Sequence, residues 1–142
     1  MNKYSKTSLE RLEGCHPDLQ DLFHAVLQKQ DHTIISGYRG PQEQNDLYHA
    51  GKSQLKYPKS KHNAKILDRE TDELIPGSRA VDALPYDQVV GRMVNGDHEH
   101  DMEKIFSFAT LVFETAAELN IKVRWGGNWK SFKDYPHWEL MP

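Results

Sequence analysis

The 142-residue chain contains a single cysteine, Cys15, and therefore cannot form an internal disulfide. Its fold does not depend on an oxidising compartment. Because no pattern of His or Asp surrounds Cys15, we expect a buried or half-buried thiol and no nucleophile. Long apolar runs are also absent, and the mean hydropathy is −0.77. No stretch approaches the length that crosses a bilayer, which excludes a membrane-spanning protein.

Positive charge is not in excess either. The chain has 18 Lys and Arg residues against 21 Asp and Glu residues, a net charge of −3. It lacks the basic footprint of a nucleic-acid-binding protein, and no nucleic-acid partner is expected. Residues 1–6 lack the apolar run of a signal peptide, so we expect synthesis in a cytoplasm without a leader. The length fits one domain over residues 1–142, and we expect a monomer.

The order of helix and strand patterns predicts an α+β fold with a small, mostly antiparallel sheet flanked by helices. Apolar residues recur at helical spacing after His16, and again through the longest candidate helix, residues 101–120. A third helix is expected at 41–50, after Pro41. Short apolar or alternating stretches predict strands at 33–36, 79–84, 121–125 and 137–141.

Three short motifs carry the residue types of a metal site. They are Ser60-Lys61-His62, Ser78-Arg79-Ala80-Val81-Asp82 and Asp134-Tyr135-Pro136-His137-Trp138-Glu139. Read in order, they offer His62, Asp82 and His137 as ligands. Two imidazoles and one carboxylate suit zinc, and three protein ligands leave the fourth tetrahedral position open for water. No His-Glu-x-x-His helix is present, so spacing alone does not establish the site.

A second group of His and acidic residues competes with this interpretation. Asp97-His98-Glu99-His100-Asp101 alternates the two residue types. In a strand, alternation would place the two histidines on one side, as metal ligands require. The segment instead follows Asn95-Gly96 and leads into the long helix, where acids are favoured at the helix N-terminus. We therefore expect a solvated loop and N-cap here.

Together, in this order, the motifs resemble the M15 zinc peptidases. These comprise D-Ala-D-Ala carboxypeptidases and dipeptidases and the small phage endolysins that are L-alanyl-D-glutamate peptidases. The similarity extends to Ser36-Gly37-Tyr38-Arg39 with Gln44 downstream, and to the stretch at residues 124–129. It thus covers nearly the whole chain. The resemblance implies a fold like that of D-Ala-D-Ala peptidases and the hedgehog signalling domain.

The resemblance also implies roles for individual residues. His62, Asp82 and His137 would hold zinc, and Asp134 would be the general base three residues before the last ligand. Arg39 would bind the carbonyl oxygen and the oxyanion that develops from it, a task that suits a guanidinium.

Further side chains near the motifs have two interpretations each. Ser60 either hydrogen-bonds substrate or caps the loop that aims His62. Gln44 either orients Arg39, in support of substrate binding, or faces solvent. Glu139 is either a partner of His137 on the same strand face or exposed. Trp125, with the other tryptophans, either walls a peptide groove and binds substrate or packs in the core.

One segment departs from the family pattern. Residues 63–77 separate His62 from Asp82, and the usual Gly after the His is absent. A charged, turn-like stretch at 68–72 between two apolar pairs predicts an inserted hairpin at about residues 65–76. A hairpin keeps its ends close, so the two ligands can still converge. The insertion is expected to lie beside the site and to shape the substrate groove.

The function expected from this resemblance is zinc-dependent hydrolysis of the L-Ala-D-Glu bond in the peptide stem of peptidoglycan. Without a leader, the chain would reach the cell wall only after release from the host bacterium. Two alternatives remain. One is a D,D-carboxypeptidase or dipeptidase acting on D-Ala-D-Ala, and the other is a non-catalytic zinc-binding module of the same fold.

Overall fold

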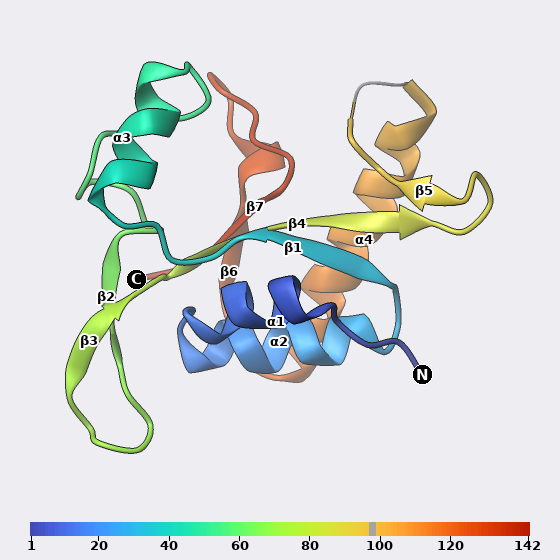
Figure 1. The fold of residues 1–142 in the computed structure, drawn as a ribbon. Coiled ribbons are helices and arrows are strands. Elements are labelled where there is room, and N and C mark those ends of the chain that lie inside the picture. Colours follow the sequence, from blue (N-terminus) through green and yellow to red (C-terminus); the bar gives the residue numbers. More distant parts are fainter. Residues whose placement is uncertain (97–98) are drawn as a thin grey trace.

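The computed structural model describes residues 1–96 and 99–142 and shows an α+β fold, as the sequence predicts (Figure 1). The helices are α1 (Lys6–Glu13), α2 (Pro17–Leu27), α3 (Pro41–His49) and α4 (Glu99–Glu118), with a short 3-10 helix η1 (Gly126–Asn128). The strands are β1 (His32–Ser36), β2 (Ala64–Leu67), β3 (Leu74–Gly77), β4 (Ala80–Asp87), β5 (Arg92–Met93), β6 (Val123–Trp125) and β7 (His137–Leu140).

The main sheet has the strand order β1-β4-β7-β6, and the short β5 pairs with the far end of β4. Every pairing within it is antiparallel. Strand β4 is longer than expected. Pro85 does not end it, because Tyr86 and Asp87 pair with β5 and the Tyr86 amide donates to the Asp31 carbonyl. The central position of β4 places Asp82 in the middle of the sheet.

The helices lie on both sides of this sheet. Figure 1 shows α1 and α2 below it, and α3 above it beside the segment that joins β6 to β7. Helix α2 begins at Pro17, and its first turn is capped by the His16 imidazole, which accepts from the Asp18 amide at 3.0 Å. Helix α1, not expected from the sequence, begins after Ser5, whose hydroxyl accepts from the Ser8 amide.

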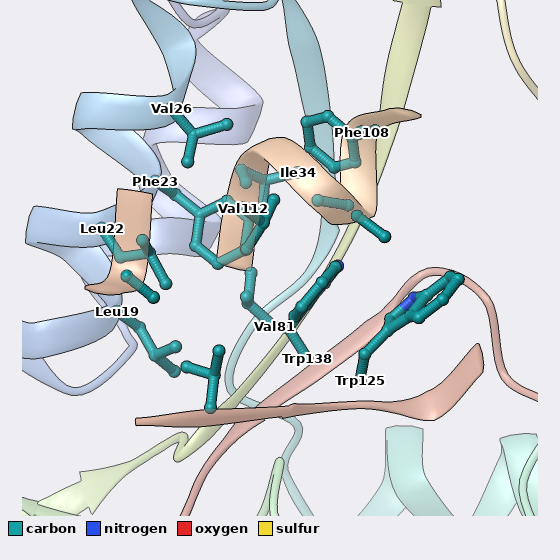
Figure 2. Packing of buried hydrophobic residues seen from close by; sticks show 14 of the residues in the cluster. Leu19, Leu22, Phe23, Val26, Ile34, Val81, Phe108, Val112, Trp125 and Trp138 are labelled. Carbon is teal, nitrogen blue, oxygen red and sulfur yellow. The ribbon is translucent and has the colours of Figure 1, made fainter. Parts of the chain in front are cut away.

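The hydrophobic core lies on the α2 and α4 side of the sheet (Figure 2). The two helices contact each other, and α4 also packs on β4 and β6. Figure 2 shows Phe23 of α2 and Val112 of α4 facing Val81 of β4 and Trp138 of β7. All four are fully buried. The alternate residues of β4 and β7 must therefore point to the opposite face.

The inserted segment is a separate two-stranded sheet made of β2 and β3. Ala64 pairs with Gly77 at its base and Leu67 with Leu74 near its tip. The hairpin predicted at 65–76 is therefore present. In Figure 1 it extends to the side opposite α3. No helix among the described residues is both long and apolar enough to cross a membrane.

Candidate active site

One row of side chains crosses the sheet on the face opposite the core. Ser36 of β1 is the register partner of Asp82 of β4, and Asp82 is the partner of His137 of β7. Neighbours in register on adjacent strands point to the same face, so their side chains meet. Two of the three predicted ligands are thus brought together by strand pairing alone.

His62 reaches the row from the loop before β2. Its backbone carbonyl accepts from the Arg39 amide at 2.9 Å, and the neighbouring Lys61 carbonyl accepts from the Arg79 amide at 2.9 Å. The Ser60 hydroxyl accepts from the His62 amide at 3.2 Å. Ser60 therefore caps the loop that aims His62, which is one of its two expected roles. The loop lies between the start of α3 and the start of β4. The His62 imidazole is almost fully buried.

The three predicted ligands converge on one point. The Asp82 Oδ1 lies 3.2 Å from His62 Nε2 and 3.2 Å from His137 Nδ1, and the two nitrogens are 3.3 Å apart. Both histidines and the aspartate are buried. Among the described residues this is the one cluster of three His, Cys or acidic side chains whose ligand atoms lie close enough to hold a metal ion.

In His62 and His137, the outer ring nitrogen, which points away from the cluster, has a fixed hydrogen-bond partner. His62 Nδ1 is 2.7 Å from the Gly37 carbonyl oxygen, and His137 Nε2 is 2.9 Å from Glu139 Oε1. A carbonyl and a carboxylate can only accept, so these nitrogens carry the protons. In the neutral form of each imidazole the inner nitrogen then presents its lone pair to the cluster. Glu139 thus has the position of a partner of His137, as one interpretation of the sequence expected.

This donor set fits a cation. Two nitrogen lone pairs and a carboxylate oxygen would repel one another unless a positive charge lies between them. Burial opposes protonation of His137, but hydrogen bonds to Asp82 and Glu139 outweigh it and raise the pKa of His137 to about 9. Burial likewise disfavours the charged carboxylate, yet the neighbouring His62 and His137 hold the pKa of Asp82 far below its usual range. A metal ion supplies the same charge at the same point.

Arg39 holds the other oxygen of Asp82. Its Nη2 donates to Asp82 Oδ2 at 2.7 Å, its Nε to Ser36 Oγ at 2.9 Å and its Nη1 to Gln44 Oε1 at 3.3 Å. These bonds use three of the five guanidinium N–H groups. Two donors remain, and Arg39 lines the cavity described below. It can therefore orient Asp82 and still donate to a bound group.

Asp134 lies at the edge of the cluster. Its Oδ2 is 3.9 Å from His137 Nδ1, and its side chain is 32% exposed, so that water reaches it. Burial, and then the negative charge of Asp82, raise the pKa of Asp134. A glycine sets this position. A Cβ on Gly126 would lie 2.3 Å from the Asp134 carbonyl oxygen, so a larger residue would displace the Asp134 loop.

A cavity of about 270 Å³ opens over the cluster. The three predicted ligands, Arg39, Ser60 and Asp134 form its floor. Residues 52–55 line one side and Trp129, Ser131 and Phe132 another. Neither wall belongs to a motif with a recognisable spacing. Sequence reasoning missed all of the first wall, and named only Trp129 from the second.

Two residues predicted to bind substrate lie outside this cavity. Trp125 is in the core, where its ring is stacked 5.7 Å from Trp138 and its Nε1 donates to the Tyr135 carbonyl. Trp129 instead lines the cavity, with its ring 5.0 Å from that of His137. Gln44 is fully buried beneath the site, where its oxygen accepts from Arg39. The structure therefore gives Gln44 the orienting position and Trp125 a packing position.

The inserted hairpin does not line the cavity, and neither do the described residues of the second acidic group. No residue of β2, β3 or their turn lines it, so the cavity does not support the expected contact of the hairpin with the groove. Arg69 in the turn pairs instead with Asp21 of α2 at 2.9 Å. Asp97 and His98 fall outside the described residues. Helix α4 begins at Glu99, two residues before the expected start, and Asp101 is buried in its first turn and accepts from Arg92, so Asp101 is not part of a solvated loop.

Comparison with known proteins decides the family. The model of the phage L-alanyl-D-glutamate peptidases matches residues 1–140. The chain belongs to this family. It is therefore a peptidase of the kind that the motifs suggested.

Individual relatives of the family are similar over most of the chain. The L-alanyl-D-glutamate peptidase of Escherichia phage T5 is 30% identical over 137 residues, which are 94% of this chain and 85% of that protein. The peptidoglycan L-alanyl-D-glutamate endopeptidase CwlK of Bacillus subtilis is 33% identical over 114 residues. This alignment covers 79% of the chain and 62% of CwlK.

A solved structure supports the fold. The crystal structure of the L-Ala D-Glu endopeptidase ChiX of Serratia marcescens matches with a TM-score of 0.68 and 28% identity. The match covers 97% of this chain and 89% of that one. The sheet that carries Asp82 and His137 thus lies within a fold shared by a peptidase of the same named specificity.

Proposed function

We propose that the chain hydrolyses the L-Ala-D-Glu bond of the peptidoglycan peptide stem, with zinc held by His62, Asp82 and His137. The observation that carries this proposal is the convergence of these three ligand atoms, with their outer partners fixed, under a cavity lined by Arg39 and Asp134. When bound, zinc supplies a Lewis acid that lowers the pKa of water and polarises a carbonyl oxygen.

Asp134 is proposed to move the protons. Its carboxylate Oδ2 takes a proton from the attacking water and gives it to the departing nitrogen of the D-glutamyl residue. The water oxygen joins the alanyl carbonyl carbon, and the bond from that carbon to nitrogen breaks. A raised pKa suits a group that must both accept and return a proton. The Asp134 Oδ2 lies 3.9 Å from His137 Nδ1, beside the cluster but beyond hydrogen-bond distance of the imidazole.

Arg39 is proposed to bind the oxygen of the alanyl carbonyl as negative charge develops on it. Its hydrogen bonds to Asp82, Ser36 and Gln44 leave two of the five N–H groups to donate to substrate, and a guanidinium offers these donors in a planar fork. Because Gln44 and Ser36 hold the rest of the group, little reorganisation is needed when substrate binds. Gln44 thus supports substrate binding indirectly, and Ser60 and Trp129 are the residues proposed to contact the stem directly.

The proposed site of action is the cell wall, as for a phage endolysin, and the partner is the peptide stem. Digestion of purified peptidoglycan followed by mass identification of the fragments tests this. Fragments ending in L-alanine, with new amino termini on D-glutamyl residues, are expected. Release of free D-alanine or of D-Ala-D-Ala would instead identify a D,D-peptidase. Intact peptidoglycan with a zinc-loaded protein would identify a binding module.

A further inference from the structure

One lysine in the cavity wall has a charged ammonium without an ion-pair partner among the described residues. Lys52 is exposed and lines the same cavity as Arg39, and its ammonium makes no hydrogen bond or ion pair with any described residue. Glu43 and Asp46 line a shallower hollow on its other side, yet neither forms an ion pair with it. The guanidinium of Arg39, which also lines the cavity, is already paired with Asp82.

The segment that carries Lys52 is held in place by the residues that hold Arg39. The Lys52 and Ser53 amides both donate to the Leu47 carbonyl at the end of α3. Gln44 Nε2 donates to Ser53 Oγ at 2.9 Å and to the Leu55 carbonyl at 2.6 Å. The oxygen of the same side chain accepts from Arg39. One buried amide therefore fixes the spacing between the Lys52 segment and the guanidinium.

The proposed substrate offers a matching charge. A D-glutamyl residue within a peptide uses one carboxyl group for the chain and keeps the other as a free carboxylate. That carboxylate belongs to the departing side of the scissile bond, a few bonds from the reacting nitrogen. We infer that Lys52 binds the free carboxylate of the D-glutamyl residue and so selects an acidic residue after the alanine. This inference rests on the proposed function. The stem would then lie with its glutamyl side towards residues 52–55 and its alanyl side towards Trp129 and Phe132.

Two lysines close by serve as contrasts. Lys56 follows in the same loop, but its ammonium lies 5.0 Å from the centre of the Tyr48 ring and does not line the cavity. Lys133 donates to the carbonyls of Gly127 and Trp129 and is also outside the lining. Lys56→Met therefore removes a nearby positive charge without touching the proposed subsite.

The test compares two peptides. One contains L-Ala-D-Glu with a free carboxylate, and the other is identical except that a carboxamide replaces it. The wild-type protein should prefer the acid in kcat/KM by up to about fivefold, the upper end for one exposed ion pair. Lys52→Met should cleave both peptides about equally. Lys52→Arg and Lys56→Met should keep the preference, which should also fall as salt is added.

The outcomes separate this inference from the function on which it rests. A wild-type preference that persists in Lys52→Met, or no preference in the wild-type protein, would overturn the role of Lys52 while leaving the peptidase activity intact. Failure of the wild-type protein to cut either peptide after alanine would overturn both.

Discussion

Asp82 and His137 are register partners on β4 and β7, and the two carboxylate oxygens of Asp82 contact different groups. Its Oδ1 faces the two imidazoles, while its Oδ2 accepts from Arg39 at 2.7 Å. A single buried carboxylate thus joins the candidate metal centre to the guanidinium proposed to bind substrate. The pairing of β4 with β7 sets the contact with His137, and loops bring His62 and Arg39 to the same carboxylate.

Glu139 is predicted to tune metal binding through His137. Its Oε1 accepts the outer proton of that imidazole at 2.9 Å, which directs the inner lone pair to the cluster. Glu139→Gln keeps the shape but weakens this bond, and zinc affinity should fall about 10- to 100-fold. Competition with a chelator of known affinity measures the change. Glu10→Gln, an exposed residue of α1, is the matched control and should leave affinity unchanged.

The inserted hairpin is predicted to be dispensable for catalysis. Because Ala64 and Gly77 are adjacent at its base, a short Gly-containing loop can replace residues 65–76. The shortened protein should keep its zinc and cut a soluble L-Ala-D-Glu peptide at close to the wild-type kcat/KM, since the hairpin lines no part of the cavity. Arg69→Ala, which removes only the exposed contact with Asp21, should cost at most about 1 kcal/mol of stability. A changed peptide preference in the shortened protein would show that the hairpin acts at the groove.

His32 is predicted to make the folded protein less stable in acid. Burial lowers the pKa of this imidazole to about 4, against about 6.5 in an unfolded chain. Between about pH 4 and pH 6.5, the His32 imidazole is protonated in the unfolded state but not in the folded state. The free energy of unfolding therefore rises with pH from about 4 to 6.5 and falls on acidification, by up to about 3 kcal/mol.

Urea denaturation at pH 7 and at pH 4.5 measures this effect. His32→Asn cannot take up a proton, yet its amide can still donate to the Gln30 carbonyl, as His32 Nδ1 does. The variant will be less stable at pH 7, but it should lose less stability on acidification than the wild-type protein. An equal loss in both would assign the acid sensitivity to other groups.

The sequence allowed the three candidate ligands to be predicted but not the shape of the cavity around them. His62, Asp82 and His137 lie in motifs whose order is specific, and alternation along β7 correctly placed Glu139 with His137. Residues 52–55 lie in a loop without periodicity, and hydrogen bonds to Leu47 and Gln44 bring them over the site. Helix α1 was missed because it is short and has few apolar residues.

The positions of the tryptophans could not be predicted from the sequence either. Their residue type suits both a peptide groove and a core, so only the packing distinguishes them. Trp125 and Trp138 stack in the core, whereas Trp129 follows η1 and lines the cavity. Sequence alone could not choose among the three.

The central claim is that His62, Asp82 and His137 hold zinc while Asp134 moves protons. Measuring zinc content beside turnover of an L-Ala-D-Glu peptide in two variants tests it most directly. His62→Ala should lose both zinc and activity. Asp134→Asn should keep about one zinc per chain and lose activity by about 10²- to 10⁴-fold, the usual contribution of a general acid–base group. Full zinc and activity in His62→Ala, or near-normal turnover in Asp134→Asn, would contradict the account.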